Sequence, residues 1–300
     1  MSYCTKTQDI DCYIQDQIQL IETALAQLIP ENDETQRSLF LGSRYSLLNG
    51  GKRLRPILML ATVSCLNGNV QHASIPACAL EMIHTYSLIH DDLPCMDNDD
   101  FRRGKPTLHK VVTEGQAVLV GDFLLTYAFE LLATAPELTE KQKIALITVL
   151  SRKSGSHGMI GGQMMDLESE DQEISLSHLQ QIHHAKTGAL LSAALEMGCI
   201  IAQASESTQK TLHLFGYDIG LAFQIIDDVL DVVASHQKHG KAIASDVVNH
   251  KSTYVTLLGV ETSKRKAEEL LNTALARLDA LPGDFSLLKG LADKLVNRSI

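Results

Sequence analysis

The chain of 300 residues contains no uncharged apolar run that is long enough to cross a membrane. A membrane-spanning helix needs about 20 mostly apolar residues, and charged side chains interrupt every apolar stretch here before about 18. The segment from Met1 to Asp16 is polar and has no apolar core typical of a secretory signal. It is also neither rich in arginine nor poor in acidic residues, as a transit peptide would be. We therefore expect no membrane span and a cytoplasmic location.

Cysteine pairs with redox or metal-binding spacing are also missing. The six cysteines include no C-x-x-C pair, and most lie in apolar surroundings. We expect them to be reduced thiols in a reducing compartment. The chain also has no excess of basic side chains, because it contains 26 Lys and Arg but 36 Asp and Glu, for a net charge of -10. This balance argues against nucleic-acid binding, so an anionic ligand has to be gathered by local basic clusters or by metal.

The alternation of apolar and polar residues that is typical of strands does not appear. Apolar residues recur instead with helical period, in segments separated by short breaks that carry Gly, Pro or Asn. The expected helices span about 10–28, 35–48, 56–66, 76–91, 114–134, 138–155, 176–202, 206–235, 250–281 and 284–298. There is no long linker or low-complexity tract. The sequence therefore predicts one all-α domain, residues 1–300, whose helices pack around a central cavity.

The pentad Asp227-Asp228-Val229-Leu230-Asp231 places three aspartates in an apolar helical stretch. Unpaired buried charges are costly, so a cation should meet them. Asp227 and Asp231 are four residues apart and differ by about 40° around a helix, with Gln224 on the same side. Carboxylates without nearby thiolates suit Mg²⁺ or Mn²⁺ rather than zinc. The alternative is that Asp231 caps a turn and the other carboxylates are solvated.

Another acidic cluster lies earlier in the chain, from Asp91 to Asp97, and continues to Asp100; in chain order it is the first acidic cluster and the pentad is the second. A regular helix would not align Asp91 with Asp97, but Pro94 between them should disturb the helix and let the chain bulge. Arg102 and Arg103 follow closely. Such a pattern forms either a surface salt-bridge patch or a metal–diphosphate site in which arginines grip phosphate oxygens.

A basic cluster, Gly50-Gly51-Lys52-Arg53-Leu54-Arg55-Pro56, lies on a glycine-rich turn at the start of a predicted helix. Backbone N–H groups, the helix N-terminus and the cations together suit an anion. The spacing of a Walker P-loop is absent and no strand precedes the turn. A solvated basic turn is the alternative. With two acidic clusters for metal and one metal-free basic cluster, the sequence predicts two anionic substrates that bind differently.

These clusters, in this order and spacing, resemble the trans (E-type) polyprenyl diphosphate synthases, especially the bacterial and plastid farnesyl and geranylgeranyl diphosphate synthases. The resemblance extends from about Gly50 to Tyr254. Besides the clusters above, the matching motifs are Gly161-Gly162-Gln163-Met164-Met165-Asp166, Lys186-Thr187-Gly188, Phe223-Gln224, Gly240-Lys241 and Lys251-Ser252-Thr253. The resemblance implies an isoprenoid-synthase fold and a prenyltransferase that joins isopentenyl diphosphate to an allylic diphosphate. Families of this kind are commonly homodimeric.

The resemblance also implies roles for individual residues. Three Mg²⁺ ions, which Mn²⁺ can replace, would be held by two carboxylates of the first cluster and one of the second, with a further one in support: Asp91, Asp97, Asp227 and Asp231. The allylic diphosphate would be held by Arg102, Lys186 and Lys241. Isopentenyl diphosphate would be held without metal by Gly51, Lys52, Arg55, His84 and Arg103. The dipoles of Thr187, Gln224 and the Lys186 carbonyl would face the developing carbocation.

Product length in the family depends on the residues just before the first acidic cluster, here Tyr86 and Ser87. A bulky ring at Tyr86 resembles farnesyl diphosphate synthases, so we expect a C15 product. On an ideal helical wheel Tyr86 lies about 140° from Asp91 and Ser87 only about 40°, so the assignment of Tyr86 as the floor of the tail pocket depends on the family. The sequence from Glu81 to Gly104 also resembles plastid geranylgeranyl synthases, which keeps a C20 product open.

Other interpretations involve fewer residues. His183 and His184 suggest a zinc site, but no third ligand has suitable spacing. Gln163 and Asp166 share a helix face and could form a structural polar pair, and Met164 and Met165 are expected to pack in the core.

Two further classes of protein compete with a synthase. A terpene cyclase is also all-α with metal-binding aspartates, but it would not need a second diphosphate site. A catalytically silent partner subunit of a synthase would usually have lost one acidic cluster, and both are complete here.

Overall fold

The computed structural model describes residues 10–31, 34–239 and 252–297, and of 234–239 it describes the backbone alone. These residues are mostly helical, with almost no strand, which confirms the all-α prediction. Within the described ranges the only strands are a short antiparallel pair, β1 Phe101–Arg102 and β2 Lys105–Pro106. The chain divides into two compact units, Met1–Ser64 with Gly68–Ile147, and Cys65–Asn67 with Thr148–Ile300.

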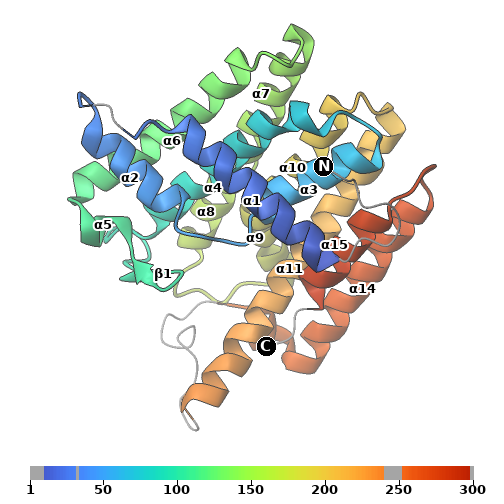
Figure 1. Cartoon of the computed structure of the whole chain (residues 1–300). Helices are drawn as coiled ribbons and strands as arrows, with labels where there is room; N and C mark the ends of the chain where they lie inside the picture. Colours follow the sequence, from blue (N-terminus) through green and yellow to red (C-terminus); the bar gives the residue numbers. More distant parts are fainter. Residues whose placement is uncertain (1–9, 32–33, 240–251, 298–300) are drawn as a thin grey trace. The chain divides into compact units, whose positions relative to one another are not determined.

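The first unit contains the β-hairpin and the N-terminal helices (Figure 1). Its elements are α1 Ile10–Leu28, α2 Arg37–Leu47, α3 Leu54–Cys65, η1 Val70–Ala73, α4 Ser74–Asp91, α5 Leu108–Val111, α6 Glu114–Thr134 and the first half of α7 Glu140–Ser154. Helix α4 packs against α6, α1 and α2. Helix α3 is apolar all round, and its residues from Pro56 to Val63 are all buried, as expected for a core helix.

The second unit contains the rest of α7 and the C-terminal helices (Figure 1). Its further elements are α8 Met159–Glu168, α9 Leu176–His183, the π-helix η2 His184–Gly188, α10 Ala189–Ile201, α11 Glu206–His239, α13 Tyr254–Leu258, α14 Val260–Asp279 and α15 Ser286–Val296. Helix α11 packs against α14, α10 and η2. Two glycines on α11 permit this close approach, because a Cβ on Gly220 would lie 2.8 Å from the Cα of Gly188 and one on Gly216 would lie 2.7 Å from the Cα of Ser192.

The predicted helix at 114–134 has the bounds of α6, whereas two other predicted helices are divided. The segment 176–202 is interrupted by the π-helix, and within 252–281 Gly259, with φ of 78°, separates α13 from α14. The hairpin was not predicted, and a helix in the α8 segment was assumed only in pairing Gln163 with Asp166.

Helix α6 is the one described helix that is long and apolar enough to cross a membrane, with a mean hydropathy of 1.6 over its most apolar window. Core helices of globular proteins meet the same criterion. Because α6 packs against α4, α2 and α5 within its unit, we interpret it as a core helix.

Candidate active site

Helix α4 ends at Asp91, which is the first residue of the first acidic cluster. Three residues later Pro94 prevents the helix from continuing. A tight turn then returns the chain, so that the backbone N–H of Asp97 donates to the carbonyl of Asp91 at 2.9 Å. Asn98, with a φ of 52°, continues this turn. The predicted bulge is therefore present, but as a loop after the helix, and it brings the backbones of the two predicted metal-binding residues together.

Asp92, the middle residue of this cluster, has a different environment from its neighbours. It is buried, whereas Asp97 is exposed and Asp91 half-buried. Its two carboxylate oxygens accept hydrogen bonds from Nε of Arg102 at 2.7 and 2.9 Å, and Nη2 of Arg102 lies 2.6 Å from Oδ1. Burial raises the pKa of Asp92, and Arg102 opposes that rise. Asp92 thus fixes Arg102, a function that the sequence analysis did not assign to it.

The two basic motifs of the first unit meet at Gly51. Arg103 and Gly104, with φ values of 56° and 78°, form the two-residue turn of the β1–β2 hairpin, a turn that requires the left-handed region. The guanidinium of Arg103 donates to the carbonyl of Gly50. A Cβ on Gly51 would lie 2.5 Å from Nη1 of Arg103, and the φ of Gly51 is 129°. Glycine is therefore needed at position 51 for both its conformation and the space it leaves.

His84 lies in a region of positive potential. Burial, then Arg55, Arg103, Arg102 and Arg53, lower the pKa of His84 well below its usual value, so its imidazole is neutral at pH 7. A neutral imidazole surrounded by guanidinium groups is a suitable hydrogen-bond donor for a phosphate. This environment connects three residues predicted to hold isopentenyl diphosphate, and a fourth, Lys52, is exposed on the same turn as Gly51.

Arg53 differs from the other cations of this region. It is 2% exposed, and its Nη1 lies 2.8 Å from Oε1 of Glu81, which is also buried. Nη2 of Arg53 donates to the carbonyl of Leu47 at 2.5 Å. Arg53 is thus a structural residue that holds the glycine-rich turn to α4, which leaves its neighbours Lys52 and Arg55 as the ligand-binding candidates.

A small cavity of about 40 Å³ lies against Arg102 and Arg103. Thr85 and Asn49 line it, and their Oγ1 and Oδ1 atoms are buried without a hydrogen-bond partner among the described residues. A space of this size suits a few water molecules rather than a substrate.

The two residues predicted to set product length belong to α4. Tyr86 is buried, with its ring edge-on to His90 at 5.7 Å between centroids. Its hydroxyl has no hydrogen-bond partner within the described part of the chain. Burial, and then Asp91, raise the pKa of Tyr86 to about 12. Ser87 donates from Oγ to the carbonyl of His84 at 2.9 Å, so its side chain turns back onto its own helix.

The second acidic cluster lies on α11 in the other unit. Asp228 is buried, where it accepts from the backbone N–H of Tyr254 at 3.0 Å and from Nε2 of Gln224 at 3.2 Å. Asp227 is half-buried and Asp231 exposed. As at Asp92, the second aspartate of the cluster is used within its own unit. The outer carboxylates are those that were predicted to bind metal.

The π-helix η2 carries two of the predicted catalytic residues. Lys186 forms an ion pair with Asp166 of α8, with 2.6 Å between Nζ and Oδ2. Thr187 donates from Oγ1 to Oε1 of Gln224 at 2.9 Å. Helix α8 can approach because Gly162 has no side chain, and a Cβ there would lie 2.2 Å from the backbone nitrogen of Lys186. The structure thus joins Lys186, Thr187 and Gln224 in one group.

Asp166 and Gly162 were not among the predicted site residues, although their spacing contained the signal. They are four residues apart and therefore share a face of α8, which is the face that meets η2. The proposed polar pair of Gln163 and Asp166 is replaced by the pair with Lys186. The prediction of a core position for Met164 was wrong, because that side chain is 55% exposed.

The donor atoms in both acidic clusters fit Mg²⁺. Within the residues that the structure describes, no group of three His, Cys, Asp or Glu side chains is close enough to hold a metal. Each cluster instead offers carboxylate oxygens, which Mg²⁺ prefers to the thiol of Cys95 in the first cluster, and substrate phosphates can complete its coordination. His183 and His184 have separate aromatic neighbours, Tyr254 at 5.6 Å and Tyr217 at 3.6 Å between ring centroids, which does not suit zinc. Lys241 lies outside the described residues.

Comparison with known proteins shows the family of the chain. The family described as "Polyprenyl synthetase" matches residues 38–284. The chain belongs to the polyprenyl synthetase family. It is 42% identical to the farnesyl diphosphate synthase of Bacillus subtilis, over 97% of this chain and 99% of that protein. It is 43% identical to the geranylgeranyl diphosphate synthase of Cyanophora paradoxa, over 96% of each chain.

The fold is also that of a solved member of this family. The geranyltransferase of Helicobacter pylori, in a structure with magnesium and isoprenyl diphosphate, superposes with a TM-score of 0.84 at 36% identity, over 98% of each chain. The predicted family, fold class and enzyme class, a prenyltransferase, are therefore confirmed.

Proposed function

We propose that this polyprenyl synthetase condenses isopentenyl diphosphate with dimethylallyl and then geranyl diphosphate to make farnesyl diphosphate. The observation that carries the proposal is the basic cluster at the glycine-rich turn, where Arg103 donates to the carbonyl of Gly50 and where burial and nearby arginines lower the pKa of His84. A terpene cyclase has no use for this metal-free anion site. The high identity to farnesyl diphosphate synthases supports the same assignment.

In this proposal the two compact units belong to one catalytic domain, and both acidic clusters supply metal ligands. Asp91 and Asp97 of one unit and Asp227 of the other, with Asp231 in support, hold three Mg²⁺ ions. When bound, Mg²⁺ stabilises the negative charge that develops on the departing diphosphate, and Mn²⁺ can supply the same chemistry. The exposed or half-buried carboxylates of these residues are accessible to such ions.

Isopentenyl diphosphate binds to Lys52, Arg55, His84 and Arg103, beside the turn at Gly51. The neutral His84 donates a hydrogen bond, and the cations neutralise the phosphate charge. Because Gly51 has no Cβ, the Arg103 guanidinium can lie close to the backbone of the turn. This position determines where the guanidinium can bind a phosphate.

The allylic diphosphate binds to Arg102, Lys186 and Lys241. Nε and Nη2 of Arg102 are occupied by Asp92, so Nη1 is the group directed to phosphate. Thr187 and the Lys186 carbonyl orient dipoles toward the allylic carbocation, and Gln224 holds the hydroxyl of Thr187. The double bond of isopentenyl diphosphate attacks this cation, and loss of a proton completes the condensation. Exclusion of water protects the cation.

Tyr86, with Ser87 beside it, forms the floor of the tail pocket and stops elongation at C15. The relative that makes geranylgeranyl diphosphate is as similar as the farnesyl synthases, so a C20 product is the second candidate.

The enzyme acts in the cytoplasm as a homodimer. The exposed apolar side chains of Leu41 on α2 and of Val118 and Leu119 on α6 suit such an interface, because α2 packs against α6. Measurement of the molecular mass in solution by light scattering tests whether the protein is a dimer.

Product analysis tests the proposed reaction. Purified protein receives isopentenyl diphosphate with dimethylallyl, geranyl or farnesyl diphosphate, in the presence of Mg²⁺ or of EDTA, and mass spectrometry follows the products. We expect Mg²⁺-dependent farnesyl diphosphate that is not extended further. A C20 product would retain the mechanism and reject the assigned floor. Absence of condensation with every primer would reject the synthase in favour of a silent partner subunit.

A further inference from the structure

Tyr217 of α11 touches both ends of the π-helix that carries Lys186 and Thr187. Its ring stacks on the ring of His184, the first residue of η2, with centroids 3.6 Å apart and planes at 5°. At the other end, a Cβ on Gly188 would lie 3.0 Å from Cδ1 of Tyr217. One side chain therefore spans the whole π-turn.

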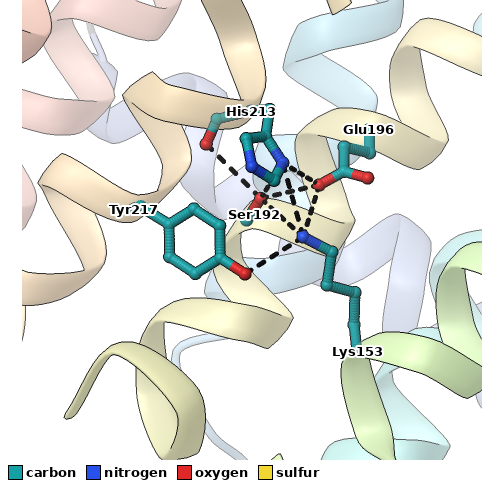
Figure 2. Close-up of polar contacts among 5 residues, drawn as sticks. All are labelled: Lys153, Ser192, Glu196, His213 and Tyr217. Atoms are coloured by element: carbon teal, nitrogen blue, oxygen red, sulfur yellow. Dashed lines mark hydrogen bonds and ion pairs between the residues drawn. The ribbon is translucent and has the colours of Figure 1, made fainter. Parts of the chain in front are cut away.

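Tyr217 is itself held by a group of polar side chains from three helices (Figure 2). Nζ of Lys153, on α7, lies 3.1 Å from the Tyr217 hydroxyl and 4.7 Å from the centre of its ring. Lys153 also forms an ion pair with Glu196 of α10 at 2.6 Å. The ring of His213, one turn earlier on α11, meets the Tyr217 ring edge-on at 4.9 Å. These contacts restrict the Tyr217 ring from both its hydroxyl and its edge.

The same polar group contains Ser192, His213 and Glu196, the residue types of a hydrolase triad, but not its geometry. In a triad the two ring nitrogens of histidine face the serine and the acid separately. Here Nδ1 of His213 lies 3.3 Å from Oγ of Ser192 and 2.5 Å from Oε1 of Glu196, so one nitrogen faces both (Figure 2). Burial opposes ionisation of Glu196, but hydrogen bonds from His213 and Lys153 lower its pKa to about 2. Glu196 is thus a permanent anion that anchors Lys153.

The π-turn needs such external support. Its i→i+5 hydrogen bonds are rare and occur mostly as single turns at functional sites. The middle of the turn is fixed by Asp166 at Lys186 and by Gln224 at Thr187. Neither contact fixes the two ends of the turn, where the chain leaves α9 and enters α10. Tyr217 contacts both ends.

We propose that Tyr217 is a positioning residue that holds the π-turn so that Lys186 and Thr187 meet the allylic substrate. The inference rests on the proposed function of those two residues. The ring carries the effect by stacking on His184 and by packing against Gly188, and the hydroxyl contributes only through Lys153. The geometry of the turn therefore depends on the aromatic ring more than on the hydroxyl.

The test compares Tyr217→Leu, which removes the stacking ring, with Tyr217→Phe, which keeps it. Misplacement of a catalytic group by about 1 Å can cost about a hundredfold in rate. We expect Tyr217→Leu to lower kcat at least about tenfold and to raise the KM of the allylic substrate. The KM of isopentenyl diphosphate should not change, because its proposed ligands belong to the other unit. Tyr217→Phe should restore most of kcat.

Arg277→Met provides the matched control. It removes an ion pair to Asp218, the neighbour of Tyr217 on α11, with 2.6 Å between Nε and Oδ2. This pair joins α11 to α14, so its loss should lower Tm and leave kcat and both KM values unchanged. If Tyr217→Leu fails to fold, Lys153→Met provides a milder test that removes the support of the Tyr217 ring. That variant should lower kcat in the same direction and by less.

A wild-type kcat in Tyr217→Leu would overturn the inference, and so would a Tyr217→Phe variant as impaired as Tyr217→Leu. Equal effects of Tyr217→Leu on both KM values would also overturn it, since they would indicate general destabilisation. If the wild-type protein condenses no substrate at all, the proposed function fails instead. Amide hydrogen exchange of residues 184–188 then decides the positioning on its own, with faster exchange expected in Tyr217→Leu than in Tyr217→Phe and equal exchange contradicting it.

Discussion

Lys186 and Asp166 form an ion pair of 2.6 Å that joins the π-helix to α8. In the proposed function, this pair determines the position of the Lys186 side chain before the allylic diphosphate binds. The substitution Asp166→Asn removes the charge that holds Lys186 but keeps a side chain of similar size. We expect kcat/KM for the allylic substrate to fall about tenfold, because a flexible lysine must be ordered during binding. Steady-state kinetics with varied geranyl diphosphate measures this change.

Asp166→Glu is the control for that prediction, since its carboxylate can still reach Lys186 and should preserve more than half of the activity. Both side chains are partly exposed, so loss of the pair should change the free energy of unfolding by less than about 1 kcal/mol. A large loss of stability in Asp166→Asn would assign the pair to folding rather than to catalysis.

Asp92→Asn and Asp97→Asn should differ in their effects on stability and on the requirement for Mg²⁺, although both residues belong to one acidic cluster. Asp92 is 4% exposed and fixes Arg102, so Asp92→Asn should lower the free energy of unfolding by about 1–3 kcal/mol. Asp97 is exposed, so Asp97→Asn should unfold like the wild type in urea. It should nevertheless lower kcat by about a hundredfold or more and require more Mg²⁺ for half-maximal rate. Equal effects of the two substitutions on stability and rate would contradict these separate roles.

Gly50 and Gly51 form a matched pair for the isopentenyl diphosphate site. Both have positive φ, 70° and 129°, but a Cβ on Gly50 meets nothing within 4 Å, whereas one on Gly51 overlaps the guanidinium of Arg103. Gly51→Ala should therefore displace Arg103 and raise the KM of isopentenyl diphosphate about tenfold or more. The KM of the allylic substrate should not change in this variant.

Gly50→Ala controls for backbone strain in this pair. It should cost about 1 kcal/mol in stability for the left-handed conformation and leave both KM values close to those of the wild type. An equal rise in the KM of isopentenyl diphosphate in both variants would show that strain in the turn, rather than the position of Arg103, sets that affinity.

Helix α6 was predictable because its apolar pattern is long and has clear ends, whereas metal binding at the acidic clusters stays a prediction that follows from the cost of unpaired charge in an apolar helix. Which aspartate of each cluster is buried was not predictable. The partners of Asp92 and Asp228 lie 10 and 26 residues away, at Arg102 and Tyr254, and only the fold brings them near.

The π-turn could not be read from periodicity for a similar reason. The apolar pattern continues through 176–202, whereas the residues that contact the turn, Tyr217 and Gly220, belong to another helix. The β-hairpin consists of two residues on each side of Arg103-Gly104, too short for an alternating pattern. The close approach of backbones at Gly162 and Gly188 is likewise a tertiary feature. A glycine in the sequence does not indicate which segment will pack against it.

Tyr86 gives a direct test of product length, because its two parts can be removed separately. If the ring is the floor of the tail pocket, Tyr86→Ala should shift the product from C15 to C20 or longer in the mass-spectrometric assay. Tyr86→Phe keeps the ring and removes a buried hydroxyl that has no hydrogen-bond partner among the described residues. Its product should remain C15 and its stability should not fall, since an unsatisfied buried hydroxyl contributes a cost of about 1–3 kcal/mol.

Removal of the ring in Tyr86→Ala should cost about 3–5 kcal/mol, so urea unfolding must establish that this variant is folded under assay conditions. A folded Tyr86→Ala that still stops at C15 would remove Tyr86 from the set of length-determining residues.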